Sequence, residues 1–570
     1  TSLLFQPQFS YSKSDSWNKN ESRTFTDDPY KYMSNPLDTT TYYTSFSQIP
    51  ERFGKLFDID ESSADAVGDL MDSLSYYYNK SIWNSQNSNS KSVSTSKSAS
   101  GNIQFVRRFG NRGRNVSVRG TYNLSHSNSE QFSRSDQTST NVMTKKKQEQ
   151  LLNRYNDNPQ DRNSWSIQST YSEPISTGTY LQLSYQFSYS AQESDRATYN
   201  MDEALQATWG NPDWIYEDNQ MVRDDSLSRR SFYYNYDQTI QLQFRKNSTD
   251  NTYNFTAGLS ILPQHSKMNY TGMGLVDTLL ERTVFNWTPT LQFRYRVTSQ
   301  EQINIRYNGR SSQPSMEQLL PIRDNTNPLR ISSGNPNLRP SFSNQLSLGY
   351  QKYNPVTMGS FNINAGLNNN MNSIQNRSIL LENGGTESKP ENMNEHGFWT
   401  NWSSNASIMY NYTFPDDRYS IMSNTSGNFN HQESWGQVGM TSQLRTSKTT
   451  SANEQLSAEY RDDYLSAELQ GSLNYSHSTN DLQPDRNMDT YSFNYGASFT
   501  SILPWRNARL ASDIQMQSRR GYDSEAMNTD ELIWNASFSF SFLKGNKATL
   551  QLAAYDILHQ RSTVSRSMST

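Results

Sequence analysis

The stretch that decides the fold is residues 291–307, LQFRYRVTSQEQINIRY. Apolar and polar side chains alternate in Leu291–Val297, and they alternate again in Gln302–Tyr307 after the polar segment Thr298–Glu301. Because successive side chains of a β-strand point to opposite faces, this pattern predicts a hairpin with aromatic residues on one face and arginines on the other.

The same pattern recurs along almost the whole chain and predicts about nineteen strands, each boundary being uncertain by ~2–4 residues. At one end of the predicted strands lie long polar stretches, such as Leu124–Thr140 and Gln375–Asn401, and we predict that these are loops. At the other end, nine short connections join the strands: Phe109–Arg114, Pro174–Gly178, Lys246–Asn251, Thr298–Glu301, Asn354–Gly359, Phe414–Arg418, Arg461–Asp463, Leu503–Asn507 and Leu543–Lys547.

Short turns on one rim and long loops on the other are typical of an outer-membrane barrel, whose turns face the periplasm and whose loops face outside. A soluble sandwich instead has strands of ~5–6 residues with turns at both ends. The predicted fold class is therefore all-β, a large antiparallel transmembrane β-barrel of about 20–22 strands in the full protein. A barrel of this width must hold water or a plug domain.

The composition agrees with a wet interior and one apolar surface. Only 33% of the 570 residues are hydrophobic and the mean hydropathy is -0.90, yet 12% are aromatic, which argues against disorder. The 51 basic and 55 acidic residues include no long basic block, so no nucleic-acid partner is predicted. There is no cysteine, and no run of about 18 apolar residues that could form a membrane-spanning helix.

The alternation assigns individual side chains to the two faces of the predicted barrel. Ala64–Tyr76 and Val142–Tyr155 have helical composition and are predicted as helices within the longer loops. The predicted lumen face includes Gln241, Gln243, Arg294, Arg296, Arg306 and Gln515. The predicted lipid face includes Phe244, Leu259, Tyr460, Leu469, Phe493, Phe538 and Phe540. An interfacial girdle near the turns is predicted from Phe414, Tyr419, Tyr464, Trp505 and Phe542.

No set of residues predicts catalysis, a cofactor or a metal site. The six histidines have no pair at ligand spacing, and the sequence has no nucleophile elbow, phosphate loop or dinucleotide fingerprint. The acidic pairs Asp416–Asp417 and Asp462–Asp463 lie in tight turns, where Asp is favoured because it hydrogen-bonds to its own backbone. We therefore expect a protein that is not an enzyme.

The most specific string in the chain lies between residues 310 and 340. It resembles a signature of TonB-dependent receptor barrels, although Ser341 stands where that family usually has Glu. The chain near Leu550–Asp556 and the following residues 557–560 also resembles the penultimate hairpin of the outer-membrane β-barrel branch common in Bacteroidetes-type bacteria. The residues that match the first signature are Arg310, Pro314, Glu317, Leu319, Gly334, Asn335, Pro336, Leu338 and Pro340.

The resemblance implies a receptor in the outer membrane of a Gram-negative cell, in contact with membrane lipid and lipopolysaccharide. Such a receptor binds an unknown ligand with its extracellular loops. It imports the ligand with energy from the TonB–ExbB–ExbD complex, which acts through a plug domain. On this basis, residues 1–570 are expected to be the barrel domain, without the amino-terminal plug and without the last strand.

Two other functions remain open from the sequence. A plug-less outer-membrane barrel could act as a porin or as a surface structure, and it would conduct without an energy input. A soluble extracellular β adhesin would pair its apolar strand faces with each other and fold without detergent. The transported ligand is not predicted, because one fold serves many substrates.

Overall fold

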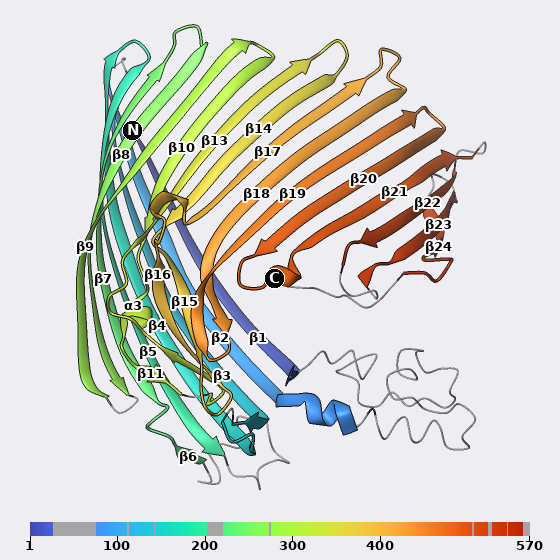
Figure 1. Ribbon diagram of the computed structural model, residues 1–570. Coiled ribbons are helices and arrows are strands. Elements are labelled where there is room, and N and C mark those ends of the chain that lie inside the picture. The colour runs from blue at the N-terminus through green and yellow to red at the C-terminus, as the bar shows by residue number, and fades with distance from the viewer. Residues whose placement is uncertain are drawn as a thin grey trace, which may run out of the picture.

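The computed structural model describes residues 1–26, 74, 76–110, 113–141, 143–201, 221–272, 275–325, 327–503, 507–522, 527–543, 545 and 547–561. Most of these residues belong to one large, curved antiparallel sheet of twenty strands (Figure 1), of which β6 (Met221–Arg223) has only three residues. Strands that follow each other along the chain are neighbours in this sheet. The predicted all-β antiparallel fold is confirmed.

The remaining strands of the large sheet are much longer than β6. They are β1 (Ser2–Phe25), β2 (Ile82–Phe109), β3 (Arg114–Thr140), β4 (Lys147–Ser176), β5 (Thr179–Met201), β7 (Arg229–Asn247), β8 (Tyr253–Gly272), β9 (Leu275–Thr298), β10 (Glu301–Ser312), β13 (Ser341–Asn354), β14 (Gly359–Met371), β17 (Asn401–Thr413), β18 (Tyr419–Val438), β19 (Thr441–Arg461), β20 (Leu465–Asn480), β21 (Met488–Ile502), β22 (Ala508–Arg520), β23 (Asp530–Phe542) and β24 (Ala548–Ala554).

The hairpin of residues 291–307 is present as β9 and β10. Tyr295 pairs with Ile303 and Phe293 with Ile305, whereas Arg294 pairs with Asn304 on the opposite face. Because the register keeps apolar beside apolar and polar beside polar, each face of the sheet has one chemical character across neighbouring strands.

Each of the nine predicted short turns lies between two consecutive strands at one end of the sheet, which we call the turn rim. Gly178 shows why such a turn needs glycine, because its φ is +74° and a Cβ there would lie 2.2 Å from the carbonyl oxygen of Asn247. Of the predicted girdle residues near this rim, four are exposed and Trp505 lies outside the described residues. The exposed four are Phe414, Tyr419, Tyr464 and Phe542.

Exposed apolar side chains form a band in the half of the sheet next to the turn rim. On β2, for example, Ile103 and Phe105 are 51% and 38% exposed, and both lie within six residues of the strand end at Phe109. Predicted lipid-face residues Leu259 and Leu469 are also exposed, by 45% and 65%. Such a band is the surface that a barrel presents to lipid.

Two predictions about loops are wrong. Leu124–Thr140 continues β3 and pairs with both β2 and β4, and the predicted helix at Val142–Tyr155 is largely the start of β4. The reason is strand length, because β2, β3 and β4 have 28, 27 and 30 residues, whereas ~9–11 residues cross a membrane. Beyond that depth, water wets both faces and alternation disappears. Of the predicted helix at Ala64–Tyr76, only Leu74 and Tyr76 are described, and both are helical.

The predicted closure of the sheet into a barrel is not found within the described residues. There, β1 pairs only with β2 and β24 only with β23, so the sheet is curved but open between these two edges. In the same part of the chain, no helix is long and apolar enough to cross a membrane.

A second, four-stranded sheet lies on the inner side of the curved one (Figure 1), and we call it the inner sheet. It consists of β11 (Arg323–Asp324), β12 (Arg330–Ser333), β15 (Ser373–Leu380) and β16 (Thr386–Met393). The short helices α3 (Met316–Leu319), η5 (Gly397–Trp399) and η6 (Pro484–Arg486) lie in the connections between long strands.

Candidate functional site

The inner sheet is built from two connections that are far apart in the sequence. β11 and β12 follow β10, β15 and β16 follow β14, and the two pieces join where β12 pairs in parallel with β16. The predicted loop Gln375–Asn401 is therefore wrong in part, because it contains most of β15, all of β16, and η5. Both connections leave the large sheet at the end opposite the turn rim.

An apolar cluster holds the inner segment against the wall of the large sheet. Met268 and Tyr270 of β8 are each 3% exposed and pack against Met316 and Leu319 of α3 and against Leu338. Fully burying a side chain of this size stabilises the fold by about 1.5–3 kcal/mol relative to exposure, so the cluster is a strong attachment.

Residues of the signature shape the segment that carries this cluster. Helix α3 begins with a capping box, in which Ser315 accepts from the Gln318 amide and the Gln318 side chain accepts from the Ser315 amide. Gly334 then passes so close to α3 that a Cβ would lie 1.9 Å from the carbonyl oxygen of Leu320. Only glycine permits this approach without a shift of the backbone.

The other signature residues divide into buried and exposed positions. Asn335 donates from Nδ2 to the carbonyl oxygen of Pro390 in β16 at 3.0 Å, which ties the two connections together. Pro314, Leu319 and Leu338 are buried, and Pro340 is half-buried beside the start of β13. Arg310, Glu317 and Pro336 are exposed. The structure thus brings most of the signature together as a support for the inner sheet.

Hydrogen bonds fix the inner segments to several strands of the wall. Asn84 of β2 donates to the Gly384 carbonyl at 2.9 Å, and Gln137 of β3 donates to Asn327 at 3.4 Å. On the other side, Arg282 of β9 donates to the Leu338 carbonyl at 2.9 Å. These contacts come from strands at different places around the curve, so the inner sheet spans the space between them.

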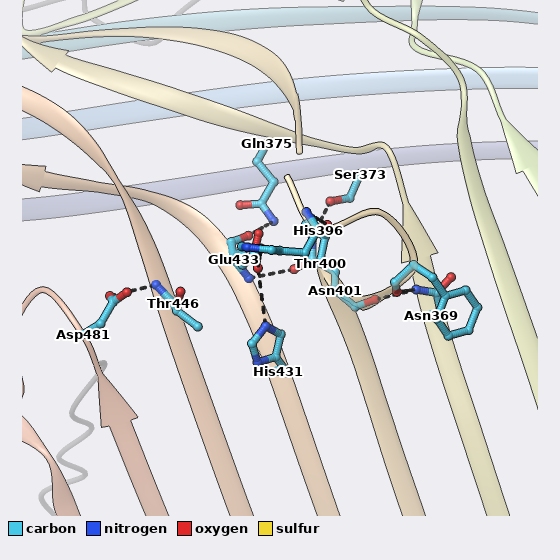
Figure 2. Close-up of polar contacts among 11 residues, drawn as sticks. Asn369, Ser373, Gln375, His396, Thr400, Asn401, His431, Glu433, Thr446 and Asp481 are labelled. Carbon is cyan, nitrogen blue, oxygen red and sulfur yellow. Dashed lines mark hydrogen bonds and ion pairs between the residues drawn. The ribbon is translucent and has the colours of Figure 1, made fainter. Parts of the chain in front are cut away.

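A buried carboxylate attaches the second connection to β18. Glu433 is 2% exposed, and Figure 2 shows His396 and His431 on either side of it. Its Oε1 lies 2.5 Å from Nδ1 of His396 and 3.6 Å from Nε2 of His431, while Gln375 of β15 donates to its backbone carbonyl at 3.0 Å. Asn401 also accepts from the Glu433 amide at 2.9 Å.

This group was not predicted from the sequence, which has no histidine pair at ligand spacing. His396 and His431 lie 35 positions apart and meet only because β17 and β18 pair in one register and the preceding connection folds back. No local pattern signals such a contact. Among the described ranges, no group of three or more His, Asp or Glu side chains could hold a metal ion.

A cavity of about 390 Å³ separates the inner sheet from β7 and β8. Arg229 of β7 and Asp324 of β11 both line it and form an ion pair, with 3.8 Å between Nη1 and Oδ2. Ser332, Ser388 and Gly334 are among the other residues that line the cavity. The cavity offers donors and acceptors of both charges to a small polar group.

Several solved structures and one family model are similar to this chain. No curated protein matches the sequence. Similar solved structures include the FrpB iron transporter from Neisseria meningitidis, which is 8% identical, with 83% of this chain and 72% of that chain covered at a TM-score of 0.32. The ferric preacinetobactin receptor BauA from Acinetobacter baumannii is 10% identical, with 82% and 72% covered at a TM-score of 0.35.

The siderophore receptor PiuA from Acinetobacter baumannii is also 10% identical, with 79% of this chain and 72% of that chain covered at a TM-score of 0.36. A family model that describes outer membrane β-barrels matches residues 107–570. The matched range contains the signature, the inner sheet and all strands from β3 onward. The chain therefore belongs to the outer membrane protein beta-barrel family.

Proposed function

We propose that the protein is the barrel of an outer-membrane receptor that imports a ligand with energy from the TonB–ExbB–ExbD complex, delivered through a plug domain. Family membership places the chain in the outer membrane of a Gram-negative cell, where the apolar band meets lipid and the turn rim faces the periplasm. The inner sheet then lies toward the extracellular side. The signature residues that resemble TonB-dependent receptors support the transport mechanism.

The observation that carries this proposal is the position of the inner sheet. A wide diffusion pore needs an open lumen, whereas here two connections fold inward and are fixed to β2, β3, β8 and β9. An inner sheet fixed in this way narrows the path for large solutes, which supports active import over a wide plug-less porin. The soluble adhesin is excluded, because the family is an outer-membrane one.

We propose that the ligand first binds at the extracellular end, where the loops and the inner sheet meet. The cavity lined by Arg229 and Asp324 is one surface there that offers both charges. Under this proposal the signature residues act as a support, because they hold β12 and α3 in place rather than contacting the ligand.

The test is uptake in cells. A strain that lacks the protein is compared with its parent for accumulation of four radiolabelled nutrients, namely a ferric siderophore, cobalamin, an oligosaccharide and a peptide. We expect the loss of one nutrient, and the same loss in a strain that keeps the protein but lacks TonB. Uptake that survives the loss of TonB would support a porin, and normal uptake of all four nutrients would overturn the proposal.

A further inference from the structure

Four arginines lie on the inner face of three strands near the turn rim. They are Arg245 of β7, Arg294 and Arg296 of β9, and Arg306 of β10. Their neighbours in phase are polar, while the intervening side chains, such as Leu242 and Tyr295, belong to the exposed apolar band. Because that band meets lipid, the arginines face the lumen. We call these four residues the arginine face.

The register shows that each of the four arginines lies directly opposite uncharged residues only. The cross-strand partners are Tyr180 and Thr256 for Arg245, Asn254 and Asn304 for Arg294, Gln302 for Arg296, and Gln292 and Ser347 for Arg306. Within the described residues, none of the four forms an ion pair. The positive potentials of the four side chains therefore add at this face, although the like charges repel one another.

Some arginines elsewhere in the large sheet have carboxylate partners. Arg461 of β19 lies 2.5 Å from Glu459, and Arg114 of β3 lies 2.5 Å from Glu173 of β4. Acidic residues thus lie beside some of the strand arginines. They are not scarce in this chain, whose formal net charge is -4. The arginine face differs from these two positions because it has four arginines on neighbouring strands with no acidic residue directly opposite any of them.

The wall at this place is also hollowed and lined with hydrogen-bonding groups. A cavity of about 450 Å³ contains Arg306 together with the amides of Gln241, Gln243 and Gln345. Arg294 donates from Nε to Asn304 Oδ1 at 3.1 Å, which orients its guanidinium group on the strand. An arginine held in this way keeps its terminal N–H groups for a second partner.

We propose that the arginine face binds a small anion that carries carboxylate or phosphate groups. Guanidinium groups bind both groups through paired, charge-assisted hydrogen bonds, and the surrounding amides satisfy the remaining oxygens. This inference names the charge class of the transported solute and so rests on the proposed function, but binding to purified protein is measured independently of uptake.

The test is calorimetric titration of the protein, purified from outer membranes in detergent, with citrate and with inorganic phosphate. Glucose serves as the neutral probe. We expect both anions to bind and glucose not to bind, and we expect the affinity to fall as salt is added because salt screens the charges. The double variant Arg294→Gln with Arg306→Gln should bind citrate at least roughly tenfold more weakly, as expected for the loss of two charge-assisted contacts.

Two matched variants make the outcome decisive. Arg294→Lys with Arg306→Lys keeps the charge but loses the paired hydrogen bonds, so it should bind citrate more weakly than wild type and more tightly than the double glutamine variant. Arg461→Gln removes an arginine that already has a carboxylate partner, and it should leave binding unchanged. If the double glutamine variant does not fold, the single Arg306→Gln variant replaces it. Equal binding of citrate and glucose, or equal loss in Arg461→Gln, would overturn the inference whatever the uptake assay shows.

Discussion

At the scale of single residues, Gly334 has no room for a side chain. A Cβ there would lie 1.9 Å from the Leu320 carbonyl oxygen, so Gly334→Ala must displace α3 or β12. We expect a loss of about 1–3 kcal/mol, which is typical of overpacking, in the attachment of the inner segment. Limited trypsin digestion checks this, because Arg323 and Arg330 lie in that segment and should be cleaved faster in the variant.

Gly471 in β20 provides the matched control for this substitution. A Cβ at that position meets no atom within 4 Å, so Gly471→Ala should be cleaved at the rate of wild type. If the Gly334→Ala protein resists trypsin as well as the Gly471→Ala protein does, the close approach of Gly334 to α3 does not hold the inner segment.

Asp462, in the turn between β19 and β20, predicts a dependence of stability on pH. Its carboxylate accepts from the backbone amides of Tyr464 and Leu465 and from the Tyr460 hydroxyl, and these hydrogen bonds lower the pKa of Asp462. A carboxyl whose folded pKa is depressed stabilises the fold above its unfolded pKa of about 3.9, and that contribution is lost as the pH falls through the folded pKa.

Asp462→Asn removes this titration while keeping a turn-forming side chain. We expect the urea midpoint of wild type to exceed that of the variant at pH 7, and the difference to shrink as the pH is lowered below about 4. A difference that stays constant between pH 7 and pH 3 would show that the charge of Asp462 does not stabilise the turn.

The side-chain phase was predictable at the residue scale, and long-range contacts were not. Alternation alone placed Arg294 and Leu259 on opposite faces, because the period of a strand is fixed by its backbone. The contact of His396 with Glu433 depends on how a connection folds back onto β18, and no spacing in the sequence encodes that. Alternation likewise gives no sign that Gly334 passes beside a carbonyl group.

At the scale of elements, the longest strands reach beyond the membrane. With a rise of ~3.3 Å per residue and a tilt of ~45°, an apolar band ~25 Å tall takes up about 11 residues. β2 has 28 residues, so its part far from the turn rim stands in water. This explains why Leu124–Thr140 looks like a loop in sequence. Its polar composition reflects contact with water on both faces, and composition does not reveal that the backbone is paired in a sheet.

A pair of single-cysteine variants tests this position of the membrane. Lys97 and Ile103 lie on the same face of β2, six residues apart, and the native chain has no cysteine to interfere. We expect a membrane-impermeant maleimide to label Lys97→Cys in intact cells and to leave Ile103→Cys unlabelled, because lipid covers the second site. Labelling of both residues at similar rates would place the membrane elsewhere on the sheet.

At the scale of the whole molecule, the large sheet and the inner sheet have different tasks. The large sheet could be predicted well from the sequence, including its nine short turns, because each hairpin is a local pattern. The inner sheet could not, because it joins two connections through the parallel pairing of Arg330–Ser332 with Thr386–Ser388, and parallel pairing has no local turn signal. The element on which the proposed function depends is thus the one that sequence periodicity cannot detect.

The proposal that the inner sheet narrows the lumen can be tested by removing the hairpin of β15 and β16. Replacing Ser373–Met393 with a short Gly–Ser linker removes the parallel partner of β12 and the contacts with Asn84 and Glu433. In cells that produce residues 1–570 without a plug domain, we expect the variant to admit large solutes and to make the cells several-fold more sensitive to vancomycin, which intact outer membranes exclude. A matched deletion of residues 481–487, which join β20 to β21 outside the inner sheet, should leave sensitivity unchanged. Unchanged sensitivity of the hairpin variant at normal surface levels would mean that the lumen is closed by something other than the inner sheet.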